Sequence, residues 1–303
     1  MPLGQPAMTT GFADYLSTKW QRVLVNVGKR YPLMYVLAMK VTDMDTNPYL
    51  SVKISGLGAM PVKAEGQQFV FDQPIPGGNF SVTAIPRGMG FSVTFEMWRD
   101  DLYGVMMDMW MHMGKSDKEA QETQAWSIFN NAFSTATGYD ATALISTSHP
   151  NLDGTTTSNR PSPDVTISQT AIQAGLLNFD LLNDDRSLAQ KINPSRLIYH
   201  PTNRWLVREI LGSSGKVQTA NNDLNALVAD ELTGLPSRYL TRTQDWFLAA
   251  PKEETDIEFM WRDRPMPRNF DDPFTMDADF TLYHRSATRI GEFRSIYGST
   301  TGV

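Results

Sequence analysis

Cysteine is absent from the 303 residues of the chain, which excludes disulfides, thiolate metal sites and a cysteine nucleophile, and favours folding inside a cell. No apolar run is long enough to span a bilayer, and no basic segment leads into an apolar stretch at the N-terminus, so neither a membrane span nor a signal peptide is predicted. The net charge of −6 argues against a dedicated nucleic-acid-binding protein, because such proteins gain affinity from clustered Lys and Arg.

Histidine is scarce, with four residues in the chain. No two of them stand at ligand spacing on one helix face, and no His-Glu-x-x-His motif occurs. Gly114-Lys115-Ser116 resembles the end of a phosphate-binding loop, but the glycine that such a loop requires five positions earlier is Met109. We therefore predict no catalytic residue, no metal ligand and no cofactor.

Two pairs of adjacent carboxylates leave one enzymatic alternative open. Asp100-Asp101 and Asp271-Asp272 could in principle hold a hard cation. Adjacent carboxylates more often cap a helix or shape a turn, so we do not predict a metal site. A hydrolase that uses one of these pairs remains the alternative to be tested.

The chain is organised around residues 95–133, where apolar residues recur at helical spacing. Asp100 and Asp101 are expected to open the helix, because acidic side chains favour the partial positive charge at a helix N-terminus. The apolar residues form two stripes, over 102–113 and 125–133, which point more than about 100° apart.

These stripes cannot both face one partner from a single straight helix. Either two helices are broken near Gly114, with Ser116 to Glu119 as a capping box, or one long spine packs against different partners along its length. An unbroken spine would be about 50 Å long, which is more natural in an elongated subunit than in a compact enzyme domain.

Residues 1–48 are predicted to be an arm that carries one helix. Residues 49–94 are rich in Gly and Pro and predict strands at 52–54, 69–71 and 80–85, with a turn at Pro74–Gly78. Such a ribbon is marginal by itself in water, so it must lie on its own domain or on a neighbouring subunit.

The second half of the chain predicts an α/β module followed by closing strands. After a loop-rich segment, we expect a helix near 168–183, a buried strand at 196–201 and a helix over 202–211 with Trp205 inward. Further expected elements are strands at 239–240, 246–249 and 258–262, a turn at 270–273 and a final strand pair within 281–294.

Three local motifs resemble those of tailed-bacteriophage major capsid proteins. They are Phe129-Asn130-Asn131-Ala132-Phe133, Gly138-Tyr139-Asp140 and Ser146 to Pro150. Ala141 and Ile145 depart from the family pattern. The order of the parts along the chain supports the resemblance better than these local motifs do. The segments 197–201, 246–248 and 259–294 are similar to the axial domain and the closing strands of that family.

The resemblance implies an α+β protein with the Hong Kong 97-like capsid fold. Its expected parts are an N-terminal arm (1–48), an extended β-loop or ribbon (49–94), a peripheral domain with the spine helix (95–164), an inserted axial α/β domain (165–255) and closing peripheral strands (256–303). The implied function is a structural major capsid protein that self-assembles through pentamers and hexamers into an icosahedral shell around double-stranded DNA. A nanocompartment shell protein is an alternative that shares this fold.

The implied partners are further copies of the chain, a separate scaffold protein, a portal and a decoration or cement protein. The packaged DNA is enclosed without sequence-specific binding, no membrane is involved, and the virion capsid is assembled in the host cytoplasm. Trp and Arg are common anchors at subunit contacts, although on one domain they can equally form a solvated rim. The predicted contact residues are Trp20, Arg22, Phe69, Phe71, Phe80, Trp98, Arg99, Asp100, Asp101, Lys216, Trp261, Arg262 and Arg264.

Overall fold

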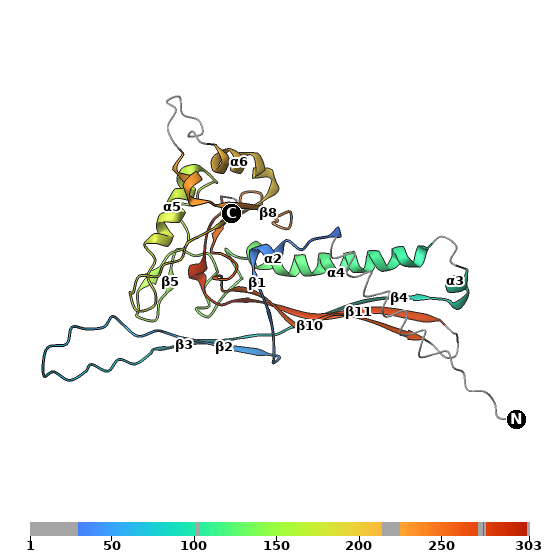
Figure 1. Ribbon diagram of the computed structural model, residues 1–303, viewed down its shortest axis with the longest axis horizontal. Helices are drawn as coiled ribbons and strands as arrows, with labels where there is room; N and C mark the ends of the chain where they lie inside the picture. Colours follow the sequence, from blue (N-terminus) through green and yellow to red (C-terminus); the bar gives the residue numbers. More distant parts are fainter. Residues whose placement is uncertain (1–29, 101–103, 214–224, 272–274, 276, 302–303) are drawn as a thin grey trace.

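The computed structural model describes residues 30–100, 104–213, 225–271, 275 and 277–301. The molecule is elongated (Figure 1), with a long sheet that runs under a long helix, a smaller sheet flanked by helices, and a ribbon that projects past both. Residues 1–29 of the predicted N-terminal arm lie outside the described residues. No helix in the described ranges is long and apolar enough to cross a membrane.

The long sheet has the strand order β1-β10-β11-β4. Its strands are β1 (Lys40–Asp43), β4 (Ile85–Val93), β10 (Ile257–Asp271) and β11 (Ala278–Ile290). β4 and β10 pair antiparallel with β11, and β1 pairs parallel with β10. Strands from both ends of the chain therefore share one sheet. β10 continues through Asp271, so the turn predicted at 270–273 does not begin at Phe270.

The spine is one short helix followed by one long helix. α3 (Phe95–Arg99) ends at its C-cap residue Asp100, and α4 (Val105–Asn130) begins after Gly104. Gly104 has φ +70°, a backbone conformation that glycine adopts without steric cost, which permits the turn between the helices. The prediction that Asp100 opens the long helix is therefore wrong.

α4 continues without a break through Gly114 for 26 residues, about 39 Å at 1.5 Å per residue. Ser116 to Glu119 lie inside it and cap nothing, so of the two alternatives the single spine is the one found. The first stripe packs, through Met106, Trp110 and Met113, against the far end of the long sheet. The second stripe joins the main core at the junction of the two sheets.

The middle of α4 is buried through polar side chains that pair with the long sheet. Asp117 Oδ1 lies 2.7 Å from Nδ1 of His284 on β11. Gln124 donates from Nε2 to the Ser286 carbonyl oxygen at 2.9 Å. These contacts hold the helix on the sheet where the apolar pattern is interrupted.

Glu122, also buried, fixes the short helix α2 (Tyr35–Ala38) to the spine. Its carboxylate accepts hydrogen bonds from the Met34 amide, from the Tyr35 amide at 3.2 Å and from Trp126 Nε1 at 2.8 Å. Burial raises the pKa of Glu122, and these three donors partly offset that effect. One carboxylate thus positions the described start of the chain on the spine.

The small sheet has the order β12-β9-β7-β8. Its strands are β7 (Arg196–Tyr199), β8 (Thr233–Pro236), β9 (Trp246–Ala249) and β12 (Ile296–Ser299). Helices α5 (Gln169–Asp180) and α6 (Arg204–Gly212) pack on it, together with the 3-10 segment η2 (Ala226–Asp230). Outside the ribbon, the remaining described elements are the short segments η1 (Pro201–Asn203), η3 (Phe293–Ser295), β5 (His149–Pro150) and β6 (Thr156–Thr157).

Several expectations for this half of the chain need correction. Tyr239-Leu240 forms no strand, and Trp205 points outward, with 69% of its surface exposed. The expected final strand pair is instead the single long strand β11, followed by β12 in the other sheet. These differences arise because strand partners come from distant parts of the chain, which local patterns do not specify.

The ribbon consists of β2 (Tyr49–Ile54) and β3 (Pro76–Val82), which pair antiparallel. The predicted strand at 69–71 is absent, and the predicted turn at Pro74–Gly78 leads into β3 instead. β4, which was expected within the ribbon, belongs to the long sheet. The residues between β2 and β3 form the long exposed tip at the left of Figure 1.

Replacing Glu122 with Leu should lower the free energy of unfolding by about 2–3 kcal/mol, because three donors lose their buried acceptor. Urea unfolding followed by circular dichroism measures this change. Thr123→Leu, one position along on the exposed face of α4, is the control and should leave the midpoint nearly unchanged. Equal midpoints for both variants would contradict the role of Glu122.

Candidate functional site

The ribbon exposes more large apolar side chains than any other described segment of its length. Met60, Phe69 and Phe71 are 94%, 74% and 90% exposed, and Leu57, Val62 and Val70 are also exposed. Contiguous exposed apolar surface of this kind marks an interaction site in a soluble protein. The ribbon is therefore the first candidate surface for binding another protein.

A buried charged cluster holds the base of the ribbon on the body. Lys53 of β2 forms ion pairs with Asp185, at 3.2 Å, and with Glu292. The Lys53 ammonium also lies 4.5 Å from the centre of the Tyr139 ring. Burial lowers the pKa of Lys53, and the Asp185 carboxylate partly offsets that effect. Burial also raises the pKa of Tyr139 to about 12, so its hydroxyl stays neutral.

Arg294 completes this cluster from η3, with a side chain only 1% exposed. It pairs with Glu292 and Asp185, each at 2.9 Å, and donates further hydrogen bonds to Asn151 and to the Asn183 carbonyl oxygen. Two cations thus face two carboxylates, and the buried charges balance. A buried ion pair of this kind is costly to break by removing one partner.

A second contact joins the tip of the ribbon to the same loop of the body. Arg186 donates from one nitrogen to both carboxylate oxygens of Asp72, at 2.7 and 2.6 Å. Asp72 also accepts the Gly58 amide at 2.7 Å. The Gly58 hydrogen bond and the Arg186 guanidinium lower the pKa of Asp72. Neighbouring residues Asp185 and Arg186 therefore hold the ribbon at two points.

The capsid-like motifs found in the sequence meet next to this cluster. Nδ1 of His149 lies 2.6 Å from Oδ2 of Asp140, and the His149 ring stacks on Phe293 at a centroid distance of 3.8 Å. His149 Nε2 lies 3.1 Å from Oδ1 of Asn159, whose amide nitrogen donates to three backbone carbonyls. These residues brace the junction between spine, ribbon and small sheet, which is a structural role.

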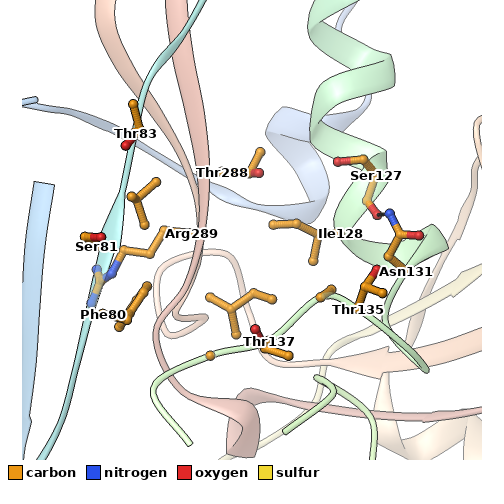
Figure 2. Close-up of a pocket in the computed structure, with 14 residues that line it drawn as sticks. Phe80, Ser81, Thr83, Ser127, Ile128, Asn131, Thr135, Thr137, Thr288 and Arg289 are labelled. Carbon is orange, nitrogen blue, oxygen red and sulfur yellow. Dashed lines mark hydrogen bonds between the residues drawn. The ribbon is translucent and has the colours of Figure 1, made fainter. Parts of the chain in front are cut away.

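A hollow of about 440 Å³ opens between β3, the end of α4 and β11 (Figure 2). Figure 2 shows Ser81, Thr83, Thr135, Thr137 and Thr288 around it, with Arg289 reaching toward Phe80 from β11. Among the described residues, no carboxylate, His or Lys lines this hollow, so its hydroxyls have no described general base beside them.

No group of three or more potential metal ligands occurs among the described residues. Asp101 and Asp272, one member of each carboxylate pair, lie outside the described residues. Gly114-Lys115-Ser116, the fragment resembling a phosphate loop, is in the interior of α4, where its amides are committed to helical hydrogen bonds.

The predicted contact residues fall into distinct environments. Phe69 and Phe71 are exposed on the ribbon, whereas Phe80 is half-buried against the main core. Arg99 and Asp100 are exposed at the end of α3. Trp98 lies on α3, and its side chain is not described. Trp20, Arg22, Asp101 and Lys216 lie outside the described residues.

Trp261 is 5% exposed and packs edge-on against Phe259 within the core, so its assignment to a subunit-contact surface needs correction. Arg262 donates to the Met44 and Asp45 carbonyl oxygens. Arg264 pairs with Asp43 at 2.8 Å on the surface. Both arginines thus tie β10 to the end of β1 within one chain.

Pattern analysis missed the residues that anchor the ribbon. The only local signal for Lys53 is a charge between Val52 and Ile54 in an alternating strand, and for Arg294 a charge within a largely apolar run. Neither signal identifies their shared partner, Asp185. It lies 132 positions from Lys53 and 109 positions from Arg294 in the sequence.

Comparison with known proteins supplies the family. The sequence profile of a family described as phage capsid protein matches residues 80–299, well over half of the chain. The chain belongs to the phage capsid protein family. It is accordingly a major capsid protein, a structural component of the virion. No curated protein sequence matches it.

Solved capsid structures share the fold of this capsid protein at low sequence identity. The capsid structure of the cyanophage P-SCSP1u aligns with a TM-score of 0.58 and 9% identity over 86% of each chain. A virus-like particle from Pyrococcus furiosus aligns with a TM-score of 0.53 and 12% identity over 93% of this chain and 98% of that one. The procapsid of bacteriophage JBD30 aligns with a TM-score of 0.51 and 13% identity over 98% and 77%. The predicted Hong Kong 97-like fold is confirmed.

Replacing Arg294 with Met should destabilise the capsid protein by about 3–5 kcal/mol, because two buried carboxylates lose a partner. Chemical unfolding of the purified subunit measures the loss. Arg264→Met is the matched control, because the Arg264 pair with Asp43 is exposed on both sides and such pairs contribute little. Similar losses for the two variants would show that the cluster is no stronger than a surface pair.

The contact between Asp72 and Arg186 should weaken in acid. The folded-state pKa of Asp72 lies below its usual value of 3.8, so the contact is complete above about pH 4 and is lost as the pH falls through that lowered pKa. Hydrogen exchange of the Gly58 amide, corrected for its intrinsic rate, should show protection at pH 6 that falls below about pH 4. Asp72→Asn should show weak protection at both pH values, and protection equal to that of the original chain would contradict this role.

Proposed function

We propose that copies of this capsid protein assemble through pentamers and hexamers into an icosahedral shell that encloses double-stranded phage DNA. The observation that carries the proposal is the ribbon, whose tip projects past the body and exposes apolar side chains. A two-stranded ribbon has no stable core of its own. A neighbouring copy of the same chain supplies the surface that it lacks.

The anchoring contacts support this role for the ribbon. Because Asp185 and Arg186 hold it at Lys53 and Asp72, the ribbon leaves each subunit in a defined direction. A repeating shell needs such a defined direction, since each interface must recur at every equivalent position. Phe69 and Phe71 at the exposed tip are the predicted contact residues that fit this interface best.

The proposed organisation follows the expected parts of the chain. The long sheet with α4 forms the peripheral domain, and the small sheet with α5 and α6 forms the axial domain, which meets its copies around the five- and six-fold axes. Arg99 and Asp100 at the exposed end of α3 are a second candidate contact.

The other partners follow from the same role. A separate scaffold protein and a portal take part in assembly in the host cytoplasm, and a decoration or cement protein binds the finished shell. The DNA inside is enclosed without sequence-specific binding, consistent with the net charge of −6. The protein performs no catalysis and acts through the shape of its subunit and the contacts between copies.

A nanocompartment shell protein is the remaining alternative, because such shells are expected to share this fold. The match to the phage capsid protein family favours the phage shell. The contents of purified particles separate the two functions. Nuclease-protected DNA supports the phage shell, and an enclosed protein cargo without DNA supports a nanocompartment.

Replacing residues 57–73 with Asn-Gly should leave a folded, soluble subunit that forms no shells. The Ser55 amide donates to the Ile75 carbonyl oxygen at 3.0 Å, so the shortened chain can close with a four-residue loop, Gly56-Asn-Gly-Pro74. Negative-stain microscopy and light scattering, with the scaffold protein present, measure assembly. The original chain should give closed shells or five- and six-membered rings.

A variant that carries Asn in place of Lys63 and Glu65, both exposed on the ribbon, is the control and should still assemble. Shells of normal size from the shortened chain would contradict the role of the ribbon. A monodisperse monomer from the original chain at high concentration, even with scaffold, would contradict the capsid function itself.

A further inference from the structure

An exposed aromatic side chain stands on one side of the small-sheet module. Trp205 in the first turn of α6 is 69% exposed. The Arg208 guanidinium lies 5.5 Å from the centre of its ring, and Arg204 precedes it in the helix. Two arginines, Arg204 and Arg208, and one acidic residue, Glu209, lie on the exposed face of α6, which therefore carries a net positive charge. Trp and Arg are among the residue types that most often dominate the binding energy at protein interfaces.

A hollow of about 520 Å³ lies between α5, η2 and the segment 193–194. Its rim includes Leu177, which is 57% exposed, and Leu181, which is 71% exposed, follows at the end of α5. Asp180 and Asp230 line the hollow, and among the described residues no Lys, Arg or His does. The hollow therefore combines the leucine side chains of Leu176, Leu177 and Leu227 with polar and acidic groups. The leucines can pack against Trp205, and the acidic groups are opposite in charge to its arginines.

The two surfaces lie on different sides of the module. In Figure 1, α5 is on the left of the small sheet and α6 is at its upper right. A ring of identical subunits requires a head-to-tail contact, in which each copy presents two different and complementary surfaces. A contact of one surface with itself produces only a dimer. The positions and the opposite charges of the α6 face and the α5–η2 hollow meet the requirement of a ring.

We propose that Trp205 of one copy docks in the α5–η2 hollow of the next copy, with Arg204 and Arg208 facing Asp180 and Asp230. This inference rests on the proposed assembly into pentamers and hexamers and identifies the surfaces that join neighbours within a ring. The occupant of the hollow is a second copy of this chain, because the chain itself carries the complementary aromatic and charge.

The absence of cysteine permits a direct test by disulfide formation. A double variant with Trp205→Cys and Leu177→Cys places one thiol on each surface of every copy. Because Trp205→Cys removes the proposed anchor, the particles are assembled at a protein concentration well above the one that the original chain needs. Their oxidation should give a ladder of linked chains on a non-reducing denaturing gel that ends at five and six chains. A mixture of the two single variants should stop at linked dimers, because each link then uses up both thiols.

Each single variant alone should remain monomeric on the gel. Trp205→Cys combined with Met89→Cys, an exposed residue of the long sheet, is the control with the same number of thiols and should give no ladder. Dimers from Trp205→Cys alone would indicate a symmetric contact and overturn the proposal. Particles that assemble but give no ladder would overturn it as well, while leaving the proposed shell function intact.

A second measurement avoids engineered thiols. Trp205→Ala should raise the protein concentration needed for assembly by about tenfold or more, because the lost side chain is an interface anchor. Its unfolding midpoint should not change, since Trp205 is exposed in the monomer. Asp180→Arg should also weaken assembly, and adding Arg208→Asp to it should restore assembly. Unchanged assembly by Trp205→Ala would overturn the proposal, and failure of the original chain to assemble would overturn both it and the shell function.

Discussion

The charged cluster of Lys53, Asp185, Glu292 and Arg294 is the contact on which the arrangement of this capsid protein depends. It joins the ribbon, the loop after α5 and the crossing from the long sheet to the small sheet. Because its charges are balanced and all but the half-buried Lys53 are nearly excluded from water, each member is costly to remove while the others remain. The cluster therefore fixes the direction of the ribbon relative to both sheets. In the proposed shell, that direction lets the ribbon reach the same surface on every neighbour.

The spine helix sets the length of the subunit by a related use of buried polar groups. Its two ends bury apolar residues against different cores, and its middle is held by Asp117, Glu122 and Gln124. Hydrogen bonds to defined partners hold the helix at one register along β11, whereas apolar contacts alone tolerate sliding. A straight α4 of 26 residues is the result. The molecule is thus elongated and carries separate surfaces far apart, which suits a shell subunit better than a compact enzyme.

Sequence patterns predicted the types of element and their order, and missed several partners and boundaries. The interruption near Gly114 was ambiguous because a polar stretch between apolar stripes is typical both of a helix break and of a helix buried through polar contacts. Only His284 and Ser286, more than 150 positions away, distinguish the two cases. Trp205 and Trp261 were misplaced for the same reason. Periodicity places a side chain on a face, but the packing of distant segments decides whether that face is covered.

The sequence by itself determined the absence of thiol chemistry, the helical spine, the Gly- and Pro-rich ribbon, the strands at both chain ends and the capsid resemblance. These properties depend on composition and on periodicity over short segments, which neighbouring residues set. Only the tertiary structure decided that the spine is unbroken, that Lys53 and Arg294 anchor the ribbon, and that Trp205 is exposed. Each of these depends on which distant side chains meet, and burial and charge pairing at those meeting points are properties of the folded chain.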